Sequence, residues 1–404
     1  MELSVDHQPR STTATDAPPS GDASVQVLVF SGTYIPYAPS GVLRTVANTV
    51  DRLGDAIQFT IITRYLEEYA DAGIQPNETR TVGHARVHYA APDRLGWVSI
   101  ASLINQFEYD VLWLNSCFTD FTVKPLVQRR LGRIDDTPVV LAPHGELLPQ
   151  ALQLKETKKK LYLSGARLGG LYDDLVWMAT NRDEEDNIYD IFGETSTVRV
   201  AQNIPDRGLL APPGTKTKEA GELSVIFLSR ISRIKNLDKA LQVLMRVKEA
   251  HVTFNIYGPV QDEDYWAACQ RMIADLPANV EASYHGTIPY EEVTETLSRH
   301  DLFFLPTQSE NYGYVILEAL AASCPVLISD RTPWHTIPDE GAGWIAPLGD
   351  DTAFVEALRE AAAMDGAAYA SYRQSAHQLA RERILDAQVV EEVRDLFITA
   401  AEDA

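Results

Sequence analysis

The sequence has 404 residues, enough for two or three domains with sizeable cores. Its hydrophobic fraction is 45% and its charged fraction 23%, so the bulk of the chain is neither disordered nor fibrous. The formal charge of −22 repels nucleic-acid backbones and argues against general DNA or RNA binding. Because no apolar run reaches the ~20 residues that span a bilayer, and the three separated cysteines suit a reducing compartment, we expect a cytoplasmic protein.

The chain alternates short β-branched runs with longer amphipathic segments, which is typical of strands and helices in an α/β fold. Residues 1–24 are poor in large apolar side chains and predict a disordered tail. The first series of strands is predicted at 25–30, 57–63, 110–115, 138–143, 175–180 and 198–201, with a helix at 43–53. Turn formers and charges in 207–221 then predict a linker. The second series is predicted at 224–228, 252–257, 280–284, 301–306 and 325–329, with helices at 237–249, 264–275, 290–298 and 384–400.

Nearly continuous apolar strands indicate parallel sheets covered by helices on both faces. One closed barrel is the alternative. The break at 207–221 favours two open sheets instead, over residues 25–206 and 222–383. Ligands of open parallel sheets bind beyond the carboxyl ends of the strands, so we expect the site in a cleft between the two domains.

The segment from Leu305 to Leu320 reads as a strand end, a loop and a helix, and it carries Glu310 and Glu318. On a helix these glutamates would lie about 12 Å apart, farther than the ~5–9.5 Å between the two carboxyls of a glycosidase. They are better suited to hold two distant hydroxyl groups of one elongated ligand. Between them, the backbone N–H groups of Asn311 to Val315 could receive a phosphate at the start of the helix. The alternative is that both glutamates are solvated surface charges.

Other candidate ligand-binding residues also follow strands. Arg230 and Lys235 lie between a strand and the next helix and could neutralise a diphosphate, although two exposed bases remain the alternative. Gly258 permits close backbone approach after the following strand. In the first half, Ser40 and Gly41 precede a helix that could receive phosphate, and His144 follows a strand.

These motifs together resemble the retaining GT-B glycosyltransferases of group 1, which use nucleotide-sugar donors. The resemblance rests on S-R-x4-K with Arg230 and Lys235, on Gly258-Pro259, on His285-Gly286 and on E-N-Y-G-x4-E from Glu310 to Glu318. It is strong over residues 224–347 and weaker in the first half. The sequence departs from the family where Ser229, Asn236 and Ser40 replace frequent glycines, which leaves the identity of the donor open.

The resemblance implies two Rossmann-like domains, with the donor held mainly by the second, the acceptor by the first, and no catalytic metal. It also implies that the C-terminal helix at 384–404 packs back on the first domain. Arg230 and Lys235 would hold the diphosphate, Glu318 the ribose, and Glu310 and His144 the donor sugar. The remaining donor contacts would come from Ser40, Gly41, Gly258, Gly286, Thr287, Ile288, Asn311, Tyr312, Gly313, Tyr314 and Val315.

No residue stands out as a general base, so we expect a donor phosphate oxygen to take the acceptor proton, with retention of configuration. Asp262-Glu263-Asp264 matches a metal-binding D-x-D pattern, but it opens a helix, where acids act as caps. We therefore expect no metal or other cofactor.

A basic segment with Lys155, Lys158, Lys159 and Lys160 predicts a helix that contacts either solvent or an anionic membrane or lipid-linked acceptor. The expected activity is glycosyl transfer to a polysaccharide, a lipid-linked glycan or a glycosylated metabolite. The alternatives are a nucleotide-sugar epimerase, a phosphorylase and a non-catalytic nucleotide-sugar-binding scaffold.

Overall fold

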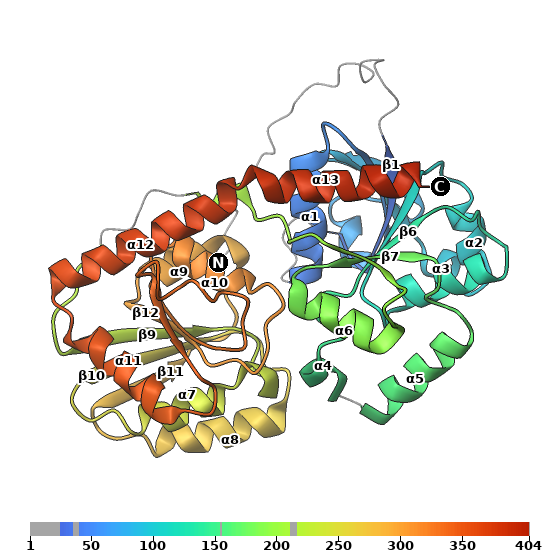
Figure 1. Ribbon diagram of the computed structural model, residues 1–404. Coiled ribbons are helices and arrows are strands. Elements are labelled where there is room, and N and C mark those ends of the chain that lie inside the picture. The colour runs from blue at the N-terminus through green and yellow to red at the C-terminus, as the bar shows by residue number, and fades with distance from the viewer. Residues whose placement is uncertain (1–24, 35–39, 154–155, 211–215, 404) are drawn as a thin grey trace.

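The computed structural model describes residues 25–34, 40–153, 156–210 and 216–403. It contains two α/β units side by side, each built around one twisted sheet (Figure 1). The tail predicted at 1–24, five residues of the predicted linker (211–215) and Lys155 lie outside the described residues.

The first sheet has eight strands in the order β3-β4-β2-β1-β5-β6-β7-β8, and all neighbouring pairs are parallel except β3 with β4. Its strands are β1 (Gln26–Ser31), β2 (Gln58–Arg64), β3 (Glu78–Val82), β4 (Ala85–Ala90), β5 (Val111–Asn115), β6 (Val139–Ala142), β7 (Leu175–Ala179) and β8 (Thr197–Val200). Alternate residues of β1 face different cores: Val27 and Val29 pack on one side, Leu28 and Phe30 on the other. Burial on both faces explains why these strands read as continuous apolar runs.

Helices cover both faces of this sheet. They are α1 (Gly41–Leu53), α2 (Ser99–Ile104), α3 (Asp120–Arg130), α4 (Pro149–Gln153), α5 (Glu156–Leu168) and α6 (Arg182–Phe192), with single 3₁₀ turns at η1 (Glu67–Ala70), η2 (Pro92–Leu95) and η3 (Arg207–Leu209). Asn181 begins α6 by accepting a hydrogen bond from the backbone N–H of Glu184 at 2.9 Å.

The second sheet has six parallel strands in the order β11-β10-β9-β12-β13-β14. They are β9 (Glu222–Leu228), β10 (His251–Tyr257), β11 (Val280–Tyr284), β12 (Leu302–Leu305), β13 (Val326–Ser329) and β14 (Gly343–Ala346). Its helices are η4 (Arg233–Lys235), α7 (Leu237–Leu244), α8 (Glu263–Ala274), α9 (Tyr290–Ser298), α10 (Tyr314–Ala321) and α11 (Asp351–Ala363). The predicted fold class, two Rossmann-like parallel-sheet domains, is confirmed.

Two long helices connect the domains at the C-terminus. α12 (Gly366–Leu385) is followed directly by Asp386. This residue caps α13 (Ala387–Glu402) by accepting from the N–H of Gln388 at 2.9 Å. α13 lies along the first domain (Figure 1), where Phe397 packs against Phe59 and Trp113 with ring centroids 6.1 and 5.1 Å apart. The predicted single helix at 384–400 is therefore wrong at its start, because the capped break at Asp386 separates it from α12.

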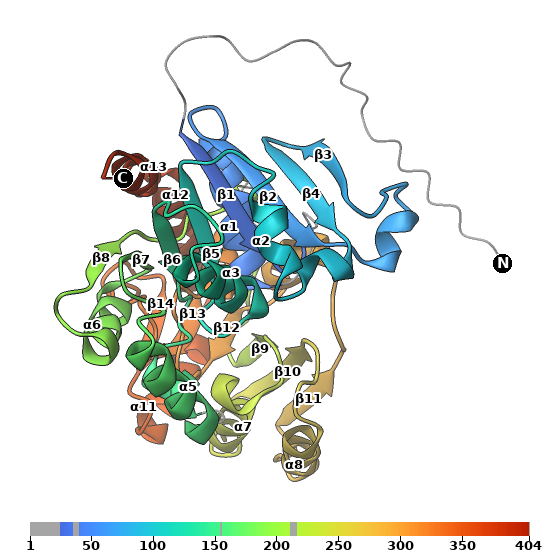
Figure 2. The same cartoon turned by 90° about the vertical axis from the view of Figure 1, so that its right-hand side faces the viewer.

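Two further differences concern element ends and sheet edges. The helix predicted at 237–249 ends at Leu244, where tighter bonds from Arg246 N–H to Val243 O (3.0 Å) and from Val247 N–H to Leu244 O (3.1 Å) replace the helical pattern. β3 was not predicted, because it is a polar antiparallel strand at the sheet edge (Figure 2). No helix in the described part of the chain is long and apolar enough to cross a membrane.

Candidate active site

The loops that follow β9, β10 and β11 meet at one edge of the second sheet. Gly258 has a φ of +129°, and a Cβ there would lie 1.9 Å from the carbonyl oxygen of Ser229. Its N–H also donates to Gly286 O at 2.8 Å. The backbone that approaches Gly258 closely, as the sequence predicted, is thus that of the neighbouring loop at Ser229. A residue without a Cβ is required here for the loops that carry Arg230 and Gly286 to meet at the same edge.

The loop after β12 joins this edge through Asn236. This residue has a φ of +64°, a left-handed conformation that asparagine tolerates better than most side chains. Its amide donates to Pro306 O at 2.9 Å. Asn236 therefore adopts the left-handed conformation at a position where the family often has glycine. Its side chain also connects the loop that carries Lys235 to the loop that carries Glu310.

Two of the predicted catalytic residues contact each other directly. Lys235 and Glu310 form an ion pair whose side chains are only 12% and 11% exposed. Arg230 is exposed in the loop after β9, and its hydrogen-bond partner is the neutral amide of Gln261, at 3.3 Å. Within the described residues Arg230 has no acidic partner, so its charge is available for an anion.

The loop that precedes α10 fixes the conformation of the chain at the start of this helix. Gly313 has a φ of +80°, and a Cβ there would lie 2.9 Å from Ile316 Cδ1. The indole N–H of Trp334 donates to Tyr312 O at 2.7 Å and fixes the preceding turn. The first N–H groups of a helix have no partner within it, so the residues from Asn311 to Val315 present donors and a partial positive charge at this edge.

Glu318, four residues into α10, is buried with 2% exposure. Burial raises the pKa of its carboxyl to about 7, and the guanidinium of Arg44 partly offsets this. Arg44 lies on α1 of the first domain, forms an ion pair with Glu318 and stacks over the ring of Tyr290 at 4.2 Å. No pattern in the sequence distinguished Arg44, because it is one of two arginines on an amphipathic helix, the other being Arg52.

The start of α1 lies against the start of α10 where the two domains meet. Ser40 caps α1 by accepting from Leu43 N–H at 3.2 Å. A Cβ at Gly41 would touch the ring of Tyr314 at 3.7 Å, and the hydroxyl of Tyr314 lies 3.0 Å from Thr45 Oγ1. The structure therefore brings these predicted donor-binding positions from the two domains together.

His144 follows β6 in a left-handed conformation, with a φ of +54°. Its Nε2 lies 2.8 Å from Asn115 Oδ1. Burial lowers the pKa of the imidazole to about 4, so the ring is neutral at pH 7. A neutral ring can hydrogen-bond a sugar hydroxyl but cannot supply positive charge to a phosphate.

Asn311 joins the two domains next to His144. Its amide donates to Thr180 Oγ1 at 2.9 Å and to Glu184 at 3.3 Å, and its carbonyl accepts from Asn181 at 2.6 Å. Burial raises the pKa of Glu184, a fully buried carboxyl that also accepts from the N–H of Gly145. Sequence reasoning missed Glu184 and Asn181, whose only visible signal was a helix start after β7.

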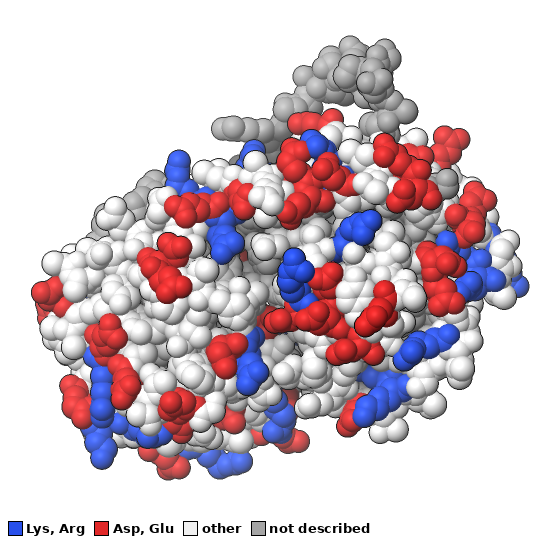
Figure 3. Space-filling model, in the orientation of Figure 1, with Lys and Arg blue, Asp and Glu red and all other residues white. Residues whose placement is uncertain are grey.

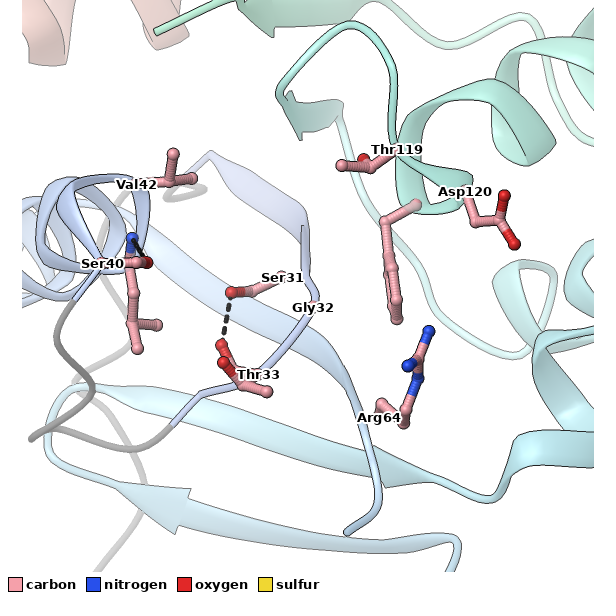
Figure 4. Close-up of a pocket in the computed structure, with 10 residues that line it drawn as sticks. Ser31, Gly32, Thr33, Ser40, Val42, Arg64, Thr119 and Asp120 are labelled. Atoms are coloured by element: carbon pink, nitrogen blue, oxygen red, sulfur yellow. Dashed lines mark hydrogen bonds between the residues drawn. The ribbon is translucent and has the colours of Figure 1, made fainter. Parts of the chain in front are cut away.

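A cavity of about 490 Å³ opens at the carboxyl ends of β1 and β2 in the first domain (Figure 4). Of its lining residues only Ser40 was predicted from the sequence. The lining is Ser31, Gly32, Thr33, Ser40, Val42, Leu43, Arg64, Thr119, Asp120 and Phe121.

The D-x-D segment acts as a helix cap, as its position predicted. One oxygen of Asp262 accepts from Tyr265 N–H at 2.9 Å, and the other contacts Arg233 at 3.1 Å. The described residues contain no cluster of three His, Cys, Asp or Glu side chains that could hold a metal ion.

Thr287 and Ile288 lie in the loop after β11, beside Gly286, and Thr287 is exposed.

Comparison with known proteins agrees with this architecture. The model of the family described as Glycosyl transferases group 1 matches residues 214–382. A Klebsiella pneumoniae protein described as an uncharacterized 41.2 kDa protein in the cps region is 22% identical over 263 residues, which are 62% of this chain and 69% of that protein.

Among solved structures, sucrose-phosphate synthase from Thermosynechococcus elongatus has a TM-score of 0.73 at 15% identity, over 94% of this chain and 100% of its own. HepE from Anabaena, solved with UDP and glucose, has a TM-score of 0.69 at 14% identity, over 93% of this chain and 100% of its own. The fold of the chain is the GT-B fold of these glycosyltransferase structures. Within it, residues 214–382 match the family of group 1 glycosyl transferases, and the resemblance predicted from the motifs is confirmed.

Proposed function

We propose that this protein is a retaining glycosyltransferase that moves a sugar from a nucleoside-diphosphate donor to an acceptor hydroxyl without a catalytic metal. The observation that carries the proposal is the meeting of an available cation, an ion-paired carboxylate and a helix start at one sheet edge. These are Arg230, the Lys235–Glu310 pair and the first turn of α10. The start of α1 lies opposite.

The donor is held mainly by the second domain. Its diphosphate lies against Arg230, Lys235 and the N–H groups of Asn311 to Val315, and its ribose hydroxyls bind Glu318. The base meets the backbone from Gly286 to Ile288. HepE, a structural neighbour, was solved with UDP, which supports a nucleotide in this cleft.

The chemistry depends on charge at the leaving group. When the bond from the sugar to the diphosphate breaks, negative charge grows on the phosphate oxygens, where the two bases and the α10 dipole stabilise it without rearrangement. Glu310 and neutral His144 orient the sugar by its hydroxyl groups. A donor phosphate oxygen accepts the proton of the acceptor hydroxyl on the same face, so the anomeric configuration is retained.

The acceptor class is a polysaccharide, a lipid-linked glycan or a glycosylated metabolite. Contact of α5 with the inner membrane face would suit a lipid-linked acceptor, because bases gather over this helix (Figure 3). Lys158 is exposed there with Leu161 and Leu168, which are 75% and 92% exposed. Lys159 instead packs over the ring of Phe118 at 4.8 Å, and Lys160 pairs with Glu156, so we assign the membrane contact chiefly to Lys158 and the two leucines.

A panel of UDP-, GDP- and ADP-sugars tests the proposal. At least one sugar nucleotide should raise the melting temperature and release nucleoside diphosphate in the presence of EDTA, and proton NMR of the product should show the donor's anomeric configuration. Conversion of the donor to an epimer without acceptor would indicate an epimerase, and a requirement for free phosphate would indicate a phosphorylase. Nucleotide binding without any turnover would indicate a scaffold and contradict the proposal.

A further inference from the structure

The cavity in the first domain contains groups that the donor does not use. Its volume of about 490 Å³ lies within the range of small-molecule sites. The chain supplies hydroxyl groups from Ser31 and Thr119, and Thr119 makes no side-chain capping bond to α3 although it occupies the cap position. The hydroxyl of Thr119 is therefore not used by the helix that it begins.

The wall of the cavity includes the cation Arg64. Arg64 is exposed at the end of β2, and its guanidinium lies over the ring of Phe121 at 5.6 Å. The nearby carboxylate of Asp120 is bound by Lys124 at 2.8 Å. Within the described residues Arg64 has no acidic partner, in a chain whose formal charge is −22.

Arginine suits one kind of ligand at such a position. Its planar guanidinium presents parallel N–H groups that match the two oxygens of a carboxylate or phosphate. The cation–π contact with Phe121, 5.6 Å from the guanidinium carbon to the ring centroid, places this cation at the wall of the cavity.

The cavity also adjoins the boundary between the two domains. Ser40 lies on the wall across from Arg64, with the segment from Ser31 to Thr33 between them (Figure 4). The next residue, Gly41, faces Tyr314 of the second domain at 3.7 Å. A ligand anchored at Arg64 would therefore extend past Ser40 towards the start of α10.

We propose that this cavity binds an anionic acceptor, with Arg64 holding its phosphate or carboxylate group while an acceptor hydroxyl reaches the cleft at Gly41. The proposal rests on the proposed function, because it names the acceptor class of that reaction. The same anion could belong to a soluble sugar phosphate or uronate, or to the phosphate of a prenyl lipid.

The test measures binding of four probes by calorimetry: glucose, glucose 6-phosphate, glucuronate and farnesyl phosphate. The protein is first saturated with whichever of UDP, GDP or ADP binds best, so that the donor phosphate site is occupied. Wild-type protein should bind at least one anionic probe 10-fold or more tightly than glucose. R64Q should lose this preference, whereas R86Q should keep it, because Arg86 is exposed on β4 and outside the cavity.

The outcomes separate the two proposals. A preference seen with sugar anions identifies a soluble acceptor, and one seen only with farnesyl phosphate identifies a lipid. Equal binding of charged and neutral probes to the wild type, or an anionic preference that survives R64Q, overturns the assignment to Arg64. If no nucleotide binds, the proposed function fails, and the same comparison in R230Q and R230Q/R64Q proteins still tests the cavity without the donor-side arginine.

Discussion

Arg44 of the first domain and Glu318 of the second form an ion pair between the domains, with side chains 19% and 3% exposed. Glu318 is the carboxylate assigned to the nucleotide ribose, so nucleotide and Arg44 compete for the same oxygens. The other charged and titratable groups around Glu318 are Asp206, which raises its pKa, and the hydroxyls of Tyr290 and Tyr314.

This pair makes nucleotide affinity depend on pH. Because burial raises the pKa of Glu318 to about 7, the carboxylate that accepts ribose hydroxyls forms as pH rises through 7, and affinity should rise with it. Arg44 lowers this pKa, so R44Q should move the midpoint to higher pH. Calorimetry between pH 5.5 and 9 measures the midpoint, with E318Q reporting the titration of the nucleotide itself. A midpoint unchanged or lowered in R44Q would contradict the coupling.

The same shift predicts the pH dependence of stability. Between the ordinary pKa of 4.5 and about 7, the folded protein holds a proton on Glu318 that the unfolded chain has released. Linkage then requires that this group's contribution to the free energy of unfolding falls as pH rises through that window. Urea unfolding should show this fall in the wild type relative to E318Q, and parallel pH profiles for the two proteins would argue against it.

Arg230 should matter to turnover and not to folding. Because Arg230 is exposed and its hydrogen-bond partner among the described residues is a neutral amide, R230Q should change the free energy of unfolding by no more than about 0.5 kcal/mol. Loss of its charge at the leaving group should slow donor cleavage by about 10²-fold or more. R233Q is the matched control, since Arg233 lies in the same loop but binds Asp262. Equal turnover in R230Q and wild type would remove Arg230 from the mechanism.

The Lys235–Glu310 pair should behave as a unit in stability. K235M leaves a carboxylate that is 11% exposed without its cation, and the cost should lie at the lower end of about 3–5 kcal/mol. E310Q added to K235M should restore most of the stability but none of the transfer rate. Chemical denaturation and donor turnover of K235M, E310Q and the double variant give a double-mutant cycle for this pair. Additive stability losses would mean that the contact contributes nothing.

Alanine substitutions at Gly258 and Gly286 distinguish a glycine that is required for steric reasons from one that is required for its backbone conformation. Both have positive φ, but a Cβ at Gly258 would overlap Ser229 O at 1.9 Å, whereas one at Gly286 would have nothing within 4 Å. G258A should therefore lower the melting temperature far more than G286A, whose cost is the left-handed conformation alone, about 1–2 kcal/mol. Thermal unfolding compares them, and similar losses would show that the contact relaxes freely.

The sequence predicted those parts of the molecule that depend on neighbouring residues. Strands such as β5 and β6, buried on both faces, were readable as apolar runs, and Arg230 and Lys235 were recognisable within one strand-to-helix loop. Arg44, Arg64 and Glu184 were not, because their roles come from contacts with segments distant in the chain. For the same reason β3, a polar strand held by its neighbour β4, gave no signal.

The most direct test of the account is a crystal structure with the best-binding nucleoside diphosphate. We predict the diphosphate between Arg230, Lys235 and the start of α10, the ribose hydroxyls on Glu318, and Arg44 displaced from that carboxylate. A nucleotide bound elsewhere, or one bound in the cleft with the Arg44–Glu318 pair intact, would contradict it.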